Sequence, residues 1–143
     1  MRRQSIEQLN AKATVTPARA EALSKRERLR RWAQLLDRIP QRELKPLSLI
    51  EYYAERDRAQ LRGDHTPIAL AYADPMLRAD GLSGDTLGHA QSYFGLSSAD
   101  AHYLLCDCHY QGRMEGRTVA KRLRAMADPN PIQRLWIRLC ACP

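Results

Sequence analysis

The sequence predicts an all-α protein: a single compact helical bundle of about six short helices, preceded by a mobile N-terminal arm. Apolar residues recur three and four positions apart in segment after segment, which places them on one face of a helix. Most of these segments begin with a serine, threonine or aspartate that can cap a helix, and no segment alternates as a half-buried strand does. A chain of 143 residues can bury one core without a metal or a disulfide.

The first predicted helix begins after Ser24, because Ser24 and Glu27 have the spacing of a capping box. Pro40 ends this helix, since proline cannot donate the next backbone hydrogen bond. Its apolar stripe consists of Leu29, Trp32, Ala33 and Leu36. A second Ser-x-x-Glu box predicts a helix over residues 48–59.

The middle of the chain begins with two short helices. Thr66 followed by Pro67 is a cap with proline at the first helical position. The helix that follows is expected to break at Asp74, where an Asp-Pro pair starts another short helix that ends at Gly81.

Residues 86–105 have the spacing of a helix-turn-helix. Asp85 is expected to cap the first helix, and Gly95 to end it in a left-handed conformation. A serine of the pair Ser97–Ser98 caps the second helix, which is predicted to run to about Tyr110. This second helix carries aspartates and no Lys or Arg, so it is a poor recognition helix for DNA. Two packed helices joined by a tight turn are the favoured interpretation.

Two more helices are predicted at the end of the chain, over Thr118–Ala127 and, after a double-proline stretch, over Ile132–Cys140. We therefore expect three parts. Residues 1–23 form a flexible arm, and residues 24–128 form the helical domain. Residues 129–143 hold an amphipathic C-terminal helix that is either separable or docked.

The net charge of +7 is unevenly distributed along the chain. Residues 1–62 carry 15 Lys and Arg against 8 Asp and Glu, and residues 111–143 carry 7 against 2. Residues 63–110 carry only Arg78 against six aspartates, and they hold all four histidines. The favoured interpretation is that the basic flanks pack around the acidic middle.

Two basic stripes could instead follow a nucleic-acid backbone. They consist of Arg26, Arg30 and Arg31 on the first helix, and of Arg117, Lys121 and Arg124 near the Thr118–Ala127 helix. No aromatic side chains interleave with them, so nucleic acid is an alternative partner rather than the favoured one. Such binding would weaken steeply with salt.

The histidines and cysteines suggest a metal site. The four cysteines form two Cys-x-Cys pairs: Cys106, Cys108, Cys140 and Cys142. On a helix that continues to about Tyr110, Cys108 is expected to face the core, whereas His102, Cys106 and His109 share a different arc. These three are candidate zinc ligands, with the C-terminal cysteine pair or an acid as the source of a fourth. A cysteine beside a histidine could also act as a redox centre or nucleophile.

The C-terminal helix offers an apolar stripe to a partner. Leu135, Trp136 and Leu139 are the candidate contacts with a protein partner or a second copy of the chain. The helix is too short to hold a membrane firmly, and no stretch of 18 or more apolar residues predicts a membrane span.

The expected function follows from these features and from the lack of sequence motifs for hydrolases, phosphate loops or dinucleotide sites. We expect a small, soluble, cytoplasmic, non-enzymatic protein-interaction or regulatory protein, with zinc as the one cofactor to consider. A basic nucleic-acid-associated regulator is the first alternative. A His/Cys metal-binding or redox module is the second.

Overall fold

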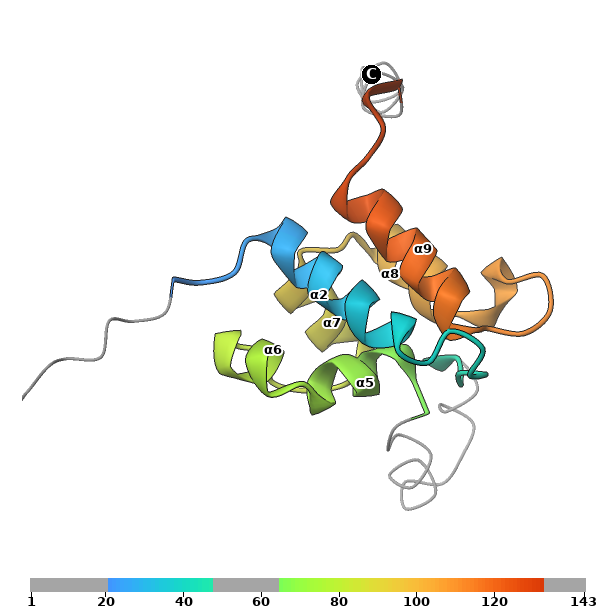
Figure 1. The fold of residues 1–143 in the computed structure, drawn as a ribbon, viewed down its shortest axis with the longest axis horizontal. Coiled ribbons are helices and arrows are strands. Elements are labelled where there is room, and N and C mark those ends of the chain that lie inside the picture. The colour runs from blue at the N-terminus through green and yellow to red at the C-terminus, as the bar shows by residue number, and fades with distance from the viewer. Residues whose placement is uncertain (1–20, 48–64, 133–143) are drawn as a thin grey trace, which may run out of the picture.

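The computed structural model describes residues 21–47 and 65–132 (Figure 1). Across these two ranges the chain forms six α-helices, one short 3₁₀ helix and no strand, which confirms the predicted all-α compact fold. The elements are α2 (Lys25–Asp37), α5 (Pro67–Ala73), α6 (Pro75–Asp80), α7 (Leu87–Phe94), α8 (Ser98–Leu105), η1 (Asp107–His109) and α9 (Gly116–Ala127). The helix predicted over 48–59, most of the one predicted from Ile132 to Cys140, and residues 1–20 of the expected arm lie outside the described residues.

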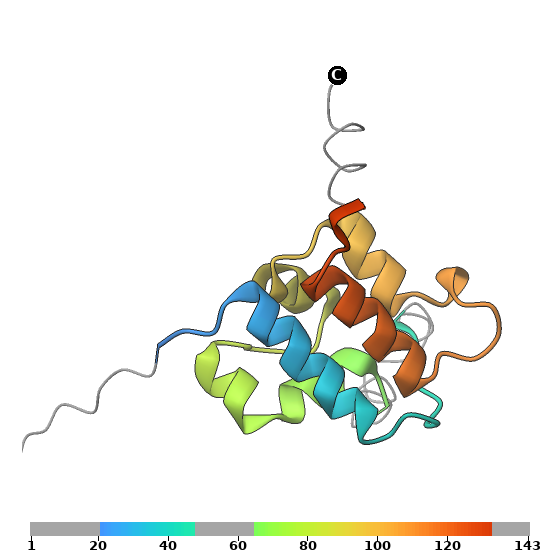
Figure 2. The same ribbon diagram turned by 45° about the horizontal axis from the view of Figure 1, so that its top comes forward.

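Helices α2 and α9 lie side by side and antiparallel, although about 80 residues separate them in the sequence (Figures 1 and 2). At one end the Gly116 amide donates to the Arg42 carbonyl at 3.1 Å, and the Arg117 amide donates to the Pro40 carbonyl at 2.9 Å. At the other end Arg30 forms an ion pair with Asp128 at 2.8 Å. Helices α5 to α8 pack around this pair and complete the core.

Side chains cap most of the helix starts, as the sequence predicts. The Glu27 amide donates to the Ser24 hydroxyl at 3.3 Å, and the Ser24 amide donates to the Glu27 carboxylate at 2.8 Å, so the capping box is present. Thr66 caps α5 and Asp74 caps α6 in the same way. Gly95 ends α7 with a left-handed φ of 61°.

Two predicted helix starts are wrong by one or two residues. The cap of α7 is Thr86 rather than Asp85, because the Thr86 hydroxyl accepts from the His89 amide. Helix α9 begins at Gly116 rather than Thr118, because the backbone hydrogen bonds to the loop after α2 fix its first turn. That loop is distant in sequence, so local patterns carry no signal for it.

The centre of the core is an aromatic pair. Trp32 of α2 and Phe94 of α7 are fully buried, and their rings stack with centroids 4.5 Å apart. The Trp32 indole N–H donates to the Pro67 carbonyl at 2.8 Å, which joins α2 to the start of α5. The predicted α2 stripe is confirmed, since all four of its residues have no exposed surface.

Ion pairs join the basic flank to the acidic middle, as the charge distribution predicts. Arg28 of α2 contacts Asp80 of α6 at 2.8 Å, and Arg31 contacts Asp74 at 2.8 Å. Both aspartates are nearly inaccessible to solvent, and such paired buried charges are costly to separate. The Tyr93 hydroxyl also donates to Asp80, so α2, α6 and α7 meet at one carboxylate.

The Asp74–Arg31 pair predicts a specific pH dependence. The hydrogen bonds from Arg31 lower the pKa of Asp74 below its ordinary value near 3.8, against an opposing effect of burial. Because the folded protein binds this proton less readily than the unfolded chain, the pair stabilises fully above the unfolded pKa, and this stability is lost as pH falls through the folded pKa. Asp74→Asn should lower the free energy of unfolding by about 1–3 kcal/mol at neutral pH. It should also flatten the fall in stability below about pH 5 in urea titrations.

Asp37→Asn is the matched control for this substitution. Asp37 also forms an ion pair with an arginine, Arg124, but both side chains are about half exposed. Exposed pairs contribute about 0–1 kcal/mol, so this variant should keep the stability and acid profile of the parent. Equal acid profiles for the two variants would contradict the assigned role of Asp74.

Within the described ranges, no helix has the length and apolar character needed to cross a lipid bilayer.

Candidate functional site

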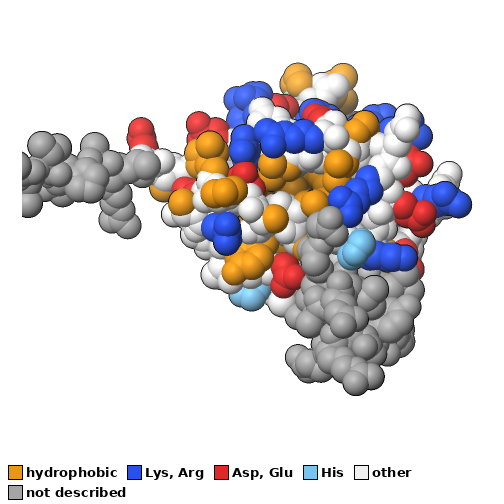
Figure 3. Space-filling view, turned by 60° about the horizontal axis from the view of Figure 1, so that its bottom comes forward, with side chains coloured by type: hydrophobic (Ala, Val, Ile, Leu, Met, Phe, Trp, Pro, Cys, Tyr) orange, Lys and Arg blue, Asp and Glu red, His pale blue; other side chains and the backbone are white. Residues whose placement is uncertain are grey.

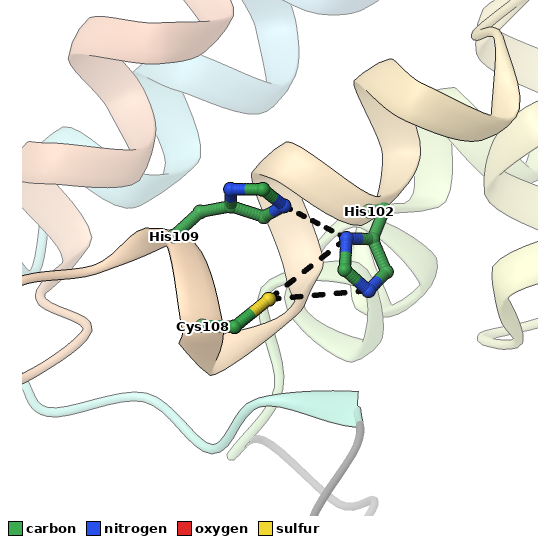
Figure 4. A group of neighbouring side chains, drawn as sticks. All are labelled: His102, Cys108 and His109. Carbon is green, nitrogen blue, oxygen red and sulfur yellow. Dashed lines mark hydrogen bonds between the residues drawn. The ribbon is translucent and has the colours of Figure 1, made fainter.

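The candidate site lies where α8 ends and the chain turns toward α9. The Ser97 hydroxyl accepts from the Asp100 amide at 3.0 Å and fixes the start of α8. The helix ends at Leu105, five residues earlier than predicted, because Cys106 has extended backbone angles. The chain then reverses through η1, which carries the residues that follow Cys106 back alongside the last turn of α8 (Figure 4).

Side chains from outside the helix satisfy the last carbonyls of α8. The Tyr110 hydroxyl donates to the Leu104 carbonyl at 2.7 Å, and Arg122 of α9 donates to the Tyr103 carbonyl. Burial raises the pKa of Tyr110 to about 12, so its hydroxyl keeps the proton that it donates. These bonds replace the helical bonds that a continuing α8 would make, which explains its early end.

Arg122 connects α9 to the end of α8 and to η1. Its guanidinium lies between the rings of Tyr103 and Tyr110, with its central carbon 3.9 Å and 3.8 Å from the two ring centroids. It also donates to the His109 carbonyl. One α9 side chain therefore holds both α8 and η1, through two cation–π contacts and two hydrogen bonds.

The reversal exchanges the predicted roles of two cysteines. Cys106 is buried, with 7% of its surface exposed, and Cys108 is exposed. The prediction that Cys106 joins the histidines while Cys108 faces the core is therefore wrong. The prediction assumed one continuous helix to about Tyr110. The extended backbone at Cys106 ends that helix, so the side chains after it point in other directions than a helix would give them.

The structure brings together His102, Cys108 and His109, all exposed (Figure 4). His102 Nδ1 lies 2.8 Å from His109 Nε2, and the Cys108 sulfur lies 3.9 Å from His102 Nδ1. The ligand atoms of all three residues lie within 4.8 Å of one another. Imidazole nitrogen and thiolate sulfur are donors that suit zinc and related metals. Two of the three residues predicted as ligands, His102 and His109, therefore lie close together, and the neighbouring sulfur is that of Cys108 rather than Cys106.

A groove adjoins this turn, between α8 and α9, with a volume of about 720 Å³. One face of α9 forms its first wall, with residues recurring at helical spacing: Thr118, Lys121, Arg122, Ala125 and Met126. The opposite wall and the ends are formed by Leu96, Asp100, Tyr103, Lys25 and Pro129. We call this the α8–α9 groove. Tyr103 contributes both to this groove and to the turn after α8, because its ring also lies 5.5 Å from that of His109.

Five of the six residues proposed for nucleic-acid contact form ion pairs within the molecule. Arg26 and Arg30 both contact Asp128, and Arg31 contacts Asp74. Arg117 and Arg124 contact Glu115 and Asp37. Lys121 lines the α8–α9 groove. Basic, acidic and hydrophobic side chains are interspersed on the face shown in Figure 3.

The remaining predicted contacts, Leu135, Trp136 and Leu139, lie outside the described residues, as do Cys140 and Cys142. The sequence reasoning missed Cys108, Tyr103 and Arg122. The tyrosines seven positions apart on either side of the Cys-Asp-Cys-His run were a possible signal, but the role of Arg122 depends on a tertiary contact that has no local signature.

Comparisons of the chain with protein-family models, with curated proteins and with solved structures found no match, so any function must be inferred from the geometry of this site itself.

Proposed function

We propose that the chain is a small non-enzymatic protein-interaction module, and that its α8–α9 groove binds an acidic amphipathic helix of a protein partner. The observation that carries this proposal is the stripe on α9, in which apolar and basic side chains share one exposed helical face. A groove between two helices accepts a third helix by the ordinary packing of ridges into grooves.

The apolar residues on the two walls of the groove support a helical occupant. Ala125 and Met126 lie on α9, and Tyr103 faces them from α8 with 42% of its surface exposed. A small residue in the middle of the stripe lets another helix come close, and methionine adapts to different apolar side chains. Tyrosine is frequent among residues that dominate binding energy at interfaces.

The charges around the groove favour an acidic occupant. Lys25, Lys121 and Arg122 lie on its walls against a single acid, Asp100. The chain as a whole also carries +7, which would steer acidic partners toward it. Nucleic acid is less favoured, because most of the arginines that could contact phosphates already contact carboxylates.

A displayed library of peptides of about 16 residues, roughly four helical turns, tests the proposal on the full chain. We expect selection of sequences with an apolar helical stripe flanked by Asp and Glu. Lys121→Glu should weaken the best peptide about tenfold, because it places like charges together at the rim. Lys45→Glu, the same change at an exposed lysine outside the groove, should leave the affinity unchanged.

A second variant tests the apolar part of the α9 wall. Ala125→Lys places a long charged side chain in the groove and should abolish peptide binding, whereas Ala79→Lys on the exposed side of α6 should not. Selection of basic peptides, or an affinity for random duplex DNA above that for the peptides, would overturn the proposal. So would dimerisation of the chain through this groove, seen by sedimentation and lost in Ala125→Lys.

A further inference from the structure

We propose that His102, Cys108 and His109 bind one zinc ion, through His102 Nδ1, His109 Nε2 and the Cys108 thiolate. None of these three ligands lines the proposed peptide groove, although Tyr103 and Arg122 contact both the groove and the turn that carries His109. The donors come from two elements, α8 and η1, and Figure 4 shows all three side chains pointing toward one another. Two imidazoles and one thiolate form a donor set typical of zinc and unsuited to magnesium or calcium, which prefer oxygen ligands.

The spacing of the donors is close to what zinc requires. Tetrahedral zinc with bonds of about 2.0–2.3 Å holds two nitrogens about 3.4 Å apart, and a nitrogen and a sulfur about 3.6 Å apart. The corresponding distances here are 2.8 Å between His102 and His109, and 3.9 Å between Cys108 and His102. Shifts of about an ångström or less in side-chain position bring these two pairs to the spacing of zinc ligands, and the third pair, Cys108 and His109, lies within 4.8 Å.

The convergence of three exposed side chains needs an explanation, since holding each in one rotamer costs conformational entropy. The two imidazole nitrogens face each other across a single shared hydrogen, which a metal ion would replace. Apart from the ring contact between His109 and Tyr103, little burial compensates for this arrangement, because all three residues are exposed. Metal coordination is an interaction strong enough to offset that entropy cost.

Groups outside the ligand set already hold the site in place. Arg122 donates to the His109 carbonyl and fixes the backbone of η1. The Tyr103 ring packs against the His109 ring, and the Tyr110 hydroxyl bonds the last turn of α8, which carries His102. The backbone of η1 and of the last turn of α8 is therefore already held in place before a metal ion binds. The exposure of the three ligands leaves the fourth coordination position open to water or to a further ligand.

Cobalt(II) binding to the untagged full chain, reduced and kept free of oxygen, tests the site. We expect one cobalt per chain, visible bands of a tetrahedral ion, and a near-ultraviolet band from charge transfer between thiolate and cobalt. Zinc should displace the cobalt and abolish the colour. Zinc affinity follows from competition with a coloured chelator.

Matched variants identify the ligands. Cys108→Ala should abolish the charge-transfer band and weaken zinc binding about a hundredfold or more, whereas Cys106→Ala, at a buried cysteine outside the ligand set, should retain both. His109→Gln should weaken binding similarly, and His65→Gln should not. Circular dichroism checks that each variant is folded.

The decisive outcomes concern Cys108. Loss of the band in Cys108→Ala supports the site, whether or not the double variant Cys140→Ala/Cys142→Ala also alters the spectrum. Retention of the band in Cys108→Ala, or less than stoichiometric binding by the intact chain, would overturn the proposal.

Discussion

Trp32→Ala is expected to lower the free energy of unfolding by about 3–5 kcal/mol, the largest effect of any single substitution considered. Trp32 is fully buried, stacks on Phe94 and donates to the Pro67 carbonyl. The variant loses the apolar contacts, leaves a cavity between α2 and α7, and leaves a buried carbonyl without its donor. Urea denaturation followed by circular dichroism measures the change.

Trp32→Phe separates packing from hydrogen bonding. Phenylalanine keeps an aromatic ring against Phe94 but cannot donate to Pro67, so a smaller loss of about 1–3 kcal/mol is expected. This variant also remains measurable if Trp32→Ala is unfolded throughout the titration. A loss below about 1 kcal/mol for Trp32→Ala would show that the aromatic pair is not the centre of the core.

Gly116→Ala is expected to destabilise the protein by about 2–3 kcal/mol, although alanine is the better helix former. A Cβ atom at Gly116 would lie 3.1 Å from the Leu36 carbonyl oxygen and closer still to the Ile39 carbonyl oxygen. Both neighbours are backbone atoms, one in the last turn of α2 and one two residues after its end, so they can move only if α2 and α9 separate. Such separation would also strain the bond from the Gly116 amide to Arg42.

Gly88→Ala is the control with the opposite expected sign. Gly88 lies in α7 at an exposed position, and the nearest atom to an added Cβ is 3.9 Å away. Alanine should therefore stabilise the protein by about 0.4–1 kcal/mol through its lower entropy in the unfolded chain. Both variants are compared by urea denaturation at the same pH. If both substitutions changed the free energy of unfolding in the same direction, the close approach of α9 to α2 would be contradicted.

The helix starts were predictable where a single local group decides them. Ser24, Thr66 and Asp74 each cap a helix through their own side chain, and the next amides along the chain are the partners. The spacing of the α2 stripe likewise identified its buried face, because a regular helix fixes which residues point inward.

The end of α8 was not predictable from local pattern. The helical spacing of the residues continues past Leu105 in the sequence. The helix ends there because Tyr110 and Arg122 donate hydrogen bonds to its last carbonyls. Arg122 is 17 residues beyond Leu105, so its effect depends on where α9 packs. A single extended residue at Cys106 was enough to reverse the predicted roles of the two cysteines.

The antiparallel packing of α2 on α9 brings the two ends of the described domain together. Arg26, in the first turn of α2, forms an ion pair with Asp128, which directly follows α9. The packing does not depend on which residue comes first in the chain. A short linker between these ends, with a new opening at exposed Ser83 between α6 and α7, gives a circular permutant with the same neighbours. In that permutant the α2–α9 contact becomes local, so the costliest loop closure of the native order is no longer needed.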